Sequence, residues 1–87
     1  MNLPRPYGVV APLTVFEMLR GLRRPDRRMV EEFLQRLTRQ PSLSGDFDAP
    51  ANDGRIHQVK IVGDWLVSYW ADHAAREVRL SGIERIE

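Results

Sequence analysis

The stretch that decides the fold is RIHQVKIVGDWLVSYWADHAAREVRL, residues 55–80. It holds three short runs rich in Val, Ile, Trp and Tyr. Two tight-turn signals separate these runs: Gly63-Asp64, and then Asp-His-Ala at residues 72–74. Apolar runs of this length joined by such turns are typical of antiparallel strands. The stretch therefore predicts a three-stranded antiparallel meander.

The first of two expected helices begins at a capping box. The Thr14 hydroxyl can accept a hydrogen bond from the Glu17 amide while the Glu17 side chain reaches back. The helix is expected to run to about Arg24. Its apolar residues fall on one face, as i, i+3 and i+4 spacing requires: Val15, Phe16, Leu19 and Leu22.

The second expected helix follows Pro25. Asp26 is a suitable N-cap with Arg27 as the first helical residue, and Pro41 ends the helix. A buried stripe recurs at helical spacing: Val30, Phe33, Leu34 and Leu37. Residues 42–54, rich in Gly, Asp, Ser and Pro, are expected to form a polar loop.

These elements predict an α+β fold of order β-α-α-β-β-β. The apolar residues 7–11, YGVVA, lie between prolines and are expected to form an edge strand. The two helices form an antiparallel hairpin that must bury its apolar stripe on one face of a small, mainly antiparallel sheet. At 87 residues, the chain is expected to be a single domain, residues 1–87.

Alternation along the strands assigns each meander residue to one of the two sheet faces. The helix-covered face is expected to hold Val59, Ile61, Trp65, Val67, Tyr69, Val78 and Leu80. The open face is expected to hold Gln58, Lys60, Leu66, Ser68, Trp70, Glu77 and Arg79. A one-residue bulge would exchange part of these two sets.

Composition points to a soluble globular protein, with 43% hydrophobic and 29% charged residues. No apolar run approaches the roughly 20 residues of a membrane span, and prolines interrupt the N-terminal segment where a signal peptide would be apolar. The absence of cysteine excludes disulfides and thiolate metal sites and fits a reducing compartment. We therefore expect a cytoplasmic protein with no membrane partner.

The net charge is only +1, yet arginines crowd residues 20–39. They are Arg20, Arg23, Arg24, Arg27, Arg28, Arg36 and Arg39. One interpretation is a solvated helical hairpin with surface ion pairs. The other is a cationic surface that attracts nucleic acid or an acidic partner peptide.

Four segments carry a resemblance to a known family: GR at 54–55, QVKI at 58–61, LVSYWAD at 66–72 and REVRL at 76–80. With the order of elements, they resemble the RelE/ParE superfamily of bacterial toxin components over about residues 7–85. The third strand of that family typically reads as an aliphatic pair, then Tyr, then an alternating residue before Asp, and residues 66–72 resemble this pattern.

The resemblance implies a cytoplasmic toxin that a co-expressed cognate antitoxin holds inactive. One branch of the family cleaves messenger RNA in the decoding site of the ribosome, without a metal or other cofactor. Another branch is not enzymatic and inhibits DNA gyrase. A plain protein-interaction module, whose only partner is a neutralising peptide, is a third hypothesis.

For the nuclease branch, the resemblance implies a catalytic role for Lys60, on a basic position of the second strand, with Gln58 beside it as an RNA-binding residue. Arg85 matches the basic position near the C-terminus. The strand-three Arg of nuclease members falls on Trp65 or Leu66, and the Tyr or His that follows the C-terminal basic position has no counterpart. The gyrase-inhibitor hypothesis therefore stays open.

Three further residues are candidates on their own chemistry. His57 is a candidate acid or base, because the imidazole side chain suits proton transfer, although a lone strand His is often only half-buried and hydrogen-bonded. Trp70 suits stacking on a base or anchoring of an antitoxin segment, unless it packs under the C-terminal tail. Lys60, Arg79 and Arg85 are expected to converge on a phosphate backbone at one rim of the open face. Two His without an acidic cluster do not predict a metal site.

Overall fold

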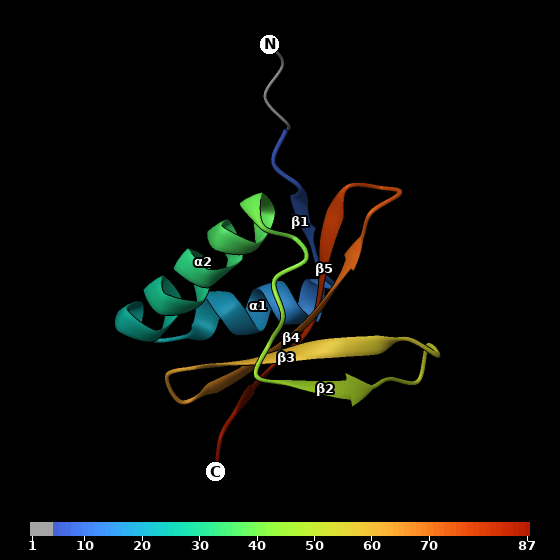
Figure 1. Cartoon of the computed structure of the whole chain (residues 1–87). Helices are drawn as coiled ribbons and strands as arrows, with labels where there is room; N and C mark the ends of the chain where they lie inside the picture. Colours follow the sequence, from blue (N-terminus) through green and yellow to red (C-terminus); the bar gives the residue numbers. More distant parts are fainter. Residues whose placement is uncertain (1–4) are drawn as a thin grey trace.

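The computed structural model describes residues 5–87, and it forms two layers (Figure 1). Two helices, α1 (Leu13–Gly21) and α2 (Arg24–Arg39), lie on one side of a five-stranded, strongly twisted sheet. The strands are β1 (Gly8–Val10), β2 (Phe47–Pro50), β3 (Ile56–Val62), β4 (Trp65–Asp72) and β5 (Glu77–Arg85). Their spatial order is β1-β5-β4-β3-β2, and only β1 runs parallel to its neighbour, β5. The expected α+β fold is confirmed.

The meander is confirmed as β3, β4 and β5, paired antiparallel in sequence order. Gly63 lies in the β3–β4 turn with a φ of 61°, a left-handed conformation that glycine adopts without a Cβ penalty. The expected edge strand is confirmed as β1. The expected loop at residues 42–54 contains one further strand, β2, which pairs with β3. The sequence did not predict this strand because it is only four residues long and ends in Pro50, which is disfavoured within sheets.

Both helices begin earlier than expected. α1 has Pro12 at its N-cap and no side-chain hydrogen bond there. The prediction of a capping box that begins at Thr14 is therefore wrong. α2 begins at Arg24, which places Pro25 and Asp26 in its first turn. Proline is favoured there because an N–H at that position has no partner within the helix. A carboxylate in the first turn is stabilised by the positive end of the helix dipole.

The first helix also ends earlier than expected, at Gly21. The reason is that Leu22 and Arg23 are both extended, and these two residues turn the chain toward α2. These two residues form the whole connection between the helices and allow α2 to fold back on α1.

The apolar core lies between the helices and β4–β5. The predicted stripe of α2 is buried in full, and Phe33 packs edge-on against Tyr69 with ring centroids 5.5 Å apart. On α1, Phe16 is 36% exposed, so the prediction that it belongs to the buried face is wrong. The members of the core are Val15, Leu19, Leu22, Val30, Phe33, Leu34, Leu37, Val67, Tyr69, Val78, Leu80 and Ile83.

The face assignment of β3 is wrong by one residue. Gln58 pairs with Tyr69, and Lys60 pairs with Val67. Both partners belong to the helix-covered core. Residues directly opposite one another in an antiparallel pair share a face, so Gln58 and Lys60 lie on the helix-facing side. The open face instead receives His57, Val59 and Ile61.

The physical reason is the path of the chain between α2 and β2. Residues 41–46 run along the helix-facing side of β3: the Leu43 carbonyl accepts from the Tyr69 hydroxyl, and the Gly45 N–H donates to the Gln58 side chain. Polar β3 residues therefore find partners on this side. Ile61 is left 46% exposed on the other side.

Candidate functional site

The six candidate residues divide between the two faces of the sheet. Gln58, Lys60 and Arg85 lie on the helix-facing side, whereas His57, Trp70 and Arg79 lie on the open face. Arg85 pairs with Trp65, which packs against the core, and Arg79 pairs with Trp70. The expectation that Lys60, Arg79 and Arg85 converge at one rim of the open face is therefore wrong.

On the helix-facing side, the β3 candidates Gln58 and Lys60 each contact a carboxylate in or near β2. Gln58 Nε2 donates to Asp48 Oδ1 at 2.6 Å, and Lys60 Nζ lies 3.4 Å from Asp46 Oδ1. The Ile61 N–H also donates to Asp46, and this bond holds the pKa of that carboxyl below its ordinary value. Asp46 is therefore ionised at neutral pH and offsets the charge of Lys60.

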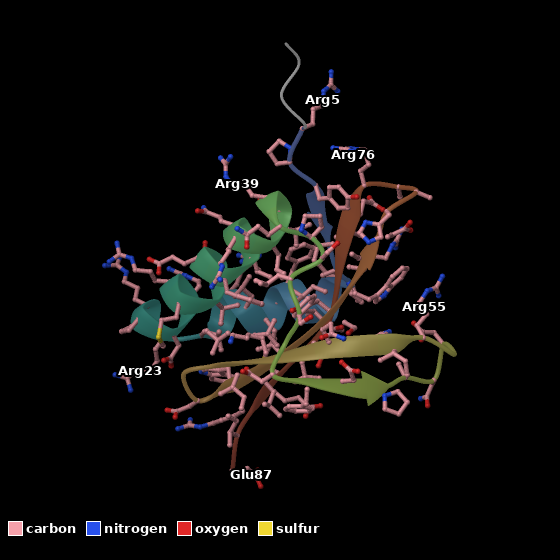
Figure 2. The ribbon with its side chains drawn as sticks, in the orientation of Figure 1. Arg5, Arg23, Arg39, Arg55, Arg76 and Glu87 are labelled. Atoms are coloured by element: carbon pink, nitrogen blue, oxygen red, sulfur yellow. The ribbon has the colours of Figure 1, made fainter. Side chains whose placement is uncertain are left out.

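On the open face, Trp70 is surrounded by cations. The guanidinium carbon of Arg55 lies 4.1 Å from the Trp70 ring centroid, and that of Arg79 lies 5.7 Å away. The His57 ring is 6.3 Å from Trp70 and tilted by 30°. The two arginine contacts are cation–π interactions, in which the ring face attracts positive charge. In Figure 2, Arg55 stands at the end of the sheet where β2 and β3 are joined.

His57 is buried and hydrogen-bonded through both ring nitrogens. Its Nε2 lies 3.0 Å from Asp53 Oδ2, and its Nδ1 lies 2.8 Å from Ser81 Oγ. The Arg55 backbone N–H and the His57 ring hold the pKa of Asp53 below its ordinary value. An ionised carboxylate can only accept, so Nε2 carries the proton of the neutral ring. Nδ1 is then an acceptor, and the Ser81 hydroxyl donates to it.

A β-bulge brings Ser81 to this position. Tyr69 pairs with Leu80 and Ser68 pairs with Gly82, so Ser81 is the extra residue on β5. Bulges redirect side chains and increase local twist. Ser81 thereby reaches His57 on β3 although β4 lies between the two strands.

Sequence reasoning singled out neither Asp53 nor Ser81. Asp53 precedes His57 by four residues, a spacing that has no meaning until the turn before β3 brings the two together. The bulge at Ser81 does carry a sequence signal, because Gly82 follows directly and a glycine within a strand pattern indicates a bulge. A second signal was that His57 required polar partners if it was buried.

A groove of about 550 Å³ borders the cluster at the end of the sheet. It is lined by residues 41–44, by Gln58 on β3 and Trp70 on β4, and by Arg55 and His73. It is large enough for a small ligand or one nucleotide.

Within residues 5–87, no three His, Cys, Asp or Glu side chains gather so that they could hold a metal ion. Over the same residues, neither helix has the length and apolarity that crossing a membrane requires.

No protein-family model matches the sequence, and no curated protein matches it. Solved structures do match. A chain of the archaeal RelE–RelB complex from Pyrococcus horikoshii superimposes with a TM-score of 0.74 at 17% identity, covering 91% of this chain and 93% of that chain. The chain has the RelE-like fold. A chain of the RelBE2 toxin–antitoxin complex from Mycobacterium tuberculosis superimposes with a TM-score of 0.69 at 20% identity, covering 98% and 97%.

The expected resemblance is thus confirmed for the fold. On this RelE-like sheet, the residues implied by the nuclease resemblance lie on the helix-facing side. The aromatic and histidine chemistry lies on the opposite face. The two sets can therefore be tested separately by mutation.

Proposed function

We propose that this protein is the toxin of a toxin–antitoxin pair and that it inhibits translation by cleaving messenger RNA on the ribosome. The observation that carries the proposal is the open face, where Arg55 and Arg79 both lie over the Trp70 ring and His57 lies beside it. The fold supports it, because the two similar structures described above are a RelE–RelB complex and a RelBE2 toxin–antitoxin complex. The proposed partners are a cognate antitoxin, the ribosome and messenger RNA, in the cytoplasm.

The open face has the chemistry that single-stranded RNA requires. Unstacked bases bind by stacking on aromatic rings, and guanidinium groups bind the phosphates between them. The Arg55 side chain is 53% exposed and that of Arg79 is 41% exposed, so both can reach a phosphate. A base would stack on Trp70 by displacing the Arg55 guanidinium from the ring.

His57 supplies the proton acceptor that cleavage without a metal needs. A ribose 2′-hydroxyl that takes the place of the Ser81 hydroxyl at Nδ1 would give its proton to that nitrogen and attack the adjacent phosphorus. The P–O5′ bond would then break to leave a 2′,3′-cyclic phosphate, and the 5′-oxygen would take a proton from solvent water. Arg79 would stabilise the charge that develops on the phosphate oxygens. The ribosome would hold the RNA in line for this attack.

A second candidate function, inhibition of DNA gyrase without catalysis, is favoured by the pairing of Lys60 with Asp46. That ion pair offsets the one lysine that the resemblance assigns to RNA cleavage. The protein would then bind its target through the arginine-rich α1–α2 hairpin, where Arg27 already pairs with Glu31 at 3.4 Å. A module with no toxicity would show neither activity.

Inducible expression with and without the neighbouring antitoxin gene separates these functions. The readouts are growth, the rates of protein and DNA synthesis, and primer extension on messenger RNA. We expect protein synthesis to stop first, with ribosome-dependent cuts that Trp70→Ala and His57→Gln reduce. If DNA synthesis stops first and no cuts appear, the gyrase function replaces the nuclease.

Lys60→Ala and Arg85→Ala complete the set, because they test the residues implied by the nuclease resemblance. If these two variants abolish the cuts while Trp70→Ala and His57→Gln keep them, the catalytic site lies on the helix-facing side of the sheet.

A further inference from the structure

Asp53, His57 and Ser81 form a continuous hydrogen-bonded chain, which we call the Ser81 triad. RNA cleavage by a 2′-hydroxyl uses the ribose as nucleophile and leaves the serine without a role. We propose that Ser81 is itself a nucleophile, activated by His57 and Asp53, and that it accepts acyl groups from esters whose acyl part carries a negative charge.

The geometry meets the requirements for an activated serine. The Ser81 Oγ to His57 Nδ1 distance is 2.8 Å, and the His57 Nε2 to Asp53 Oδ2 distance is 3.0 Å. Both lie within hydrogen-bond reach, with a nucleophile, a base and a group that orients the base. Ser81 is exposed, whereas His57 is only 8% exposed. A substrate can therefore reach the hydroxyl while the base is shielded from water.

Asp53 keeps the imidazole in the tautomer that the reaction needs. In the serine proteases the carboxylate binds Nδ1 and the serine binds Nε2. Here the two nitrogens exchange partners. The exchange preserves the chemistry, because either nitrogen of a neutral ring accepts a proton when the other one donates. The low pKa of Asp53 keeps its carboxylate ionised to stabilise the imidazolium.

Two arginines near Ser81 set the class of substrate. Arg79 precedes Ser81 by two residues on β5, and Arg55 lies on the Trp70 ring. Arg79 shares its charge with two carboxylates, Glu77 at 2.9 Å and Asp72 at 3.6 Å. Arg55 is more exposed and lies 3.9 Å from the carboxylate of Asp53, a longer contact, so Arg55 is the stronger attraction for an anion. The Trp70 face suits a planar leaving group. These features together favour an anionic acyl group on an aromatic alcohol.

The reaction proceeds in two balanced steps. Ser81 Oγ attacks the carbonyl carbon, and its proton moves to His57 Nδ1. The tetrahedral intermediate then expels the alcohol, which takes the proton from Nδ1 and leaves an ester on Ser81. Water attacks this ester by the same route, so that the acid is released and the Ser81 hydroxyl is restored.

The test uses the purified full chain with mono-(4-nitrophenyl) succinate as the probe and 4-nitrophenyl acetate as the neutral comparison. We expect a burst of about one nitrophenol per chain, faster with the succinate ester, and a succinyl adduct on Ser81 by peptide mass spectrometry. Ser81→Ala should remove the adduct. His57→Gln should slow labelling by about 100-fold or more, and Asp53→Asn by a smaller factor.

Ser68→Ala is the matched control, since Ser68 lies on the same face of the adjacent strand. It should label at the parental rate, and thermal melting should show every variant to be folded. Equal labelling of the parent and Ser81→Ala, or an undiminished rate in folded His57→Gln, overturns the proposal. A parent that gives no adduct also overturns it. Because this experiment contains neither RNA nor ribosomes, its failure leaves the proposed toxin function standing.

Discussion

The Arg55 guanidinium lies over the Trp70 ring, 4.1 Å from the ring centroid. The two residues come from neighbouring strands, since Arg55 immediately precedes β3 and Trp70 belongs to β4. The arginine covers an aromatic face that would otherwise be open to solvent. It can exchange that contact for a phosphate when a base stacks on the ring. The exposed cation–π contact is worth only about 0.5–1 kcal/mol, whereas a stacked base is worth about 1–3 kcal/mol.

Truncation of Trp70 should therefore weaken RNA binding. Loss of one stacked base costs about 1–3 kcal/mol, so Trp70→Ala should raise the Kd for a short single-stranded RNA by about 5- to 150-fold. Trp70→Phe keeps an aromatic face and should retain most of the affinity. Fluorescence anisotropy with a labelled oligonucleotide measures both. Equal affinities for the parent and the alanine variant would place RNA elsewhere.

Phe33→Ala tests the core. Phe33 is 7% exposed and packs against Tyr69, so its loss should reduce the free energy of unfolding by about 3–5 kcal/mol. Phe16→Ala makes the same chemical change at a residue that is 36% exposed and should cost clearly less. Urea unfolding followed by circular dichroism gives both values. Similar losses at the two positions would contradict the placement of the core.

Gly45→Ala tests the path of the chain over β3. A Cβ at Gly45 would lie 2.5 Å from the Val59 carbonyl oxygen, which is backbone and cannot move aside cheaply. We expect a loss of about 1–3 kcal/mol in the free energy of unfolding. Gly21→Ala is the control, since a Cβ there meets nothing within 4 Å. It should be neutral or stabilising by up to about 1 kcal/mol.

Asp46 should make stability depend on pH in the acid range. Its pKa is lowered in the folded state, so it stabilises the protein fully above its unfolded pKa, which lies near 3.9. That contribution is lost as the pH falls from about 5 through the lower folded pKa. Asp46→Asn should flatten the fall of Tm over this window. An unchanged slope would mean that the bond from the Ile61 N–H does not favour the ionised carboxylate.

The sequence was sufficient to predict those elements that pack against a single apolar surface or carry their own turn signals. The α2 stripe faces a single apolar surface, and the meander turns carry their own signals. It was insufficient for β3, where the buried Val59 lies on the open face and the polar Gln58 and Lys60 lie on the helix-facing side. Helices and a polar connector share one face, so alternation alone selected the wrong one.

The candidate site depended on features that alternation does not contain. His57, Trp70 and Arg79 were recognised by residue type, and the structure brings them together. Asp53 and Ser81 join them only through a tight turn and a β-bulge. The free energies of such local irregularities depend on contacts across three strands, which no short window of sequence describes.

The salt dependence of RNA binding distinguishes the open face from the arginine-rich hairpin. For single-stranded nucleic acid, each phosphate contact contributes about 0.7 to the slope of log K against log salt concentration. Arg55→Gln should therefore reduce the magnitude of that slope by about 0.7. Arg23→Gln removes the same charge from an exposed arginine at the junction of α1 and α2, far from Arg55 in Figure 2, and should leave the slope unchanged. Binding titrations between low and physiological salt provide the slopes. If Arg23→Gln lowers the slope and Arg55→Gln does not, RNA binds the helical hairpin, and the Trp70 cluster is not its site.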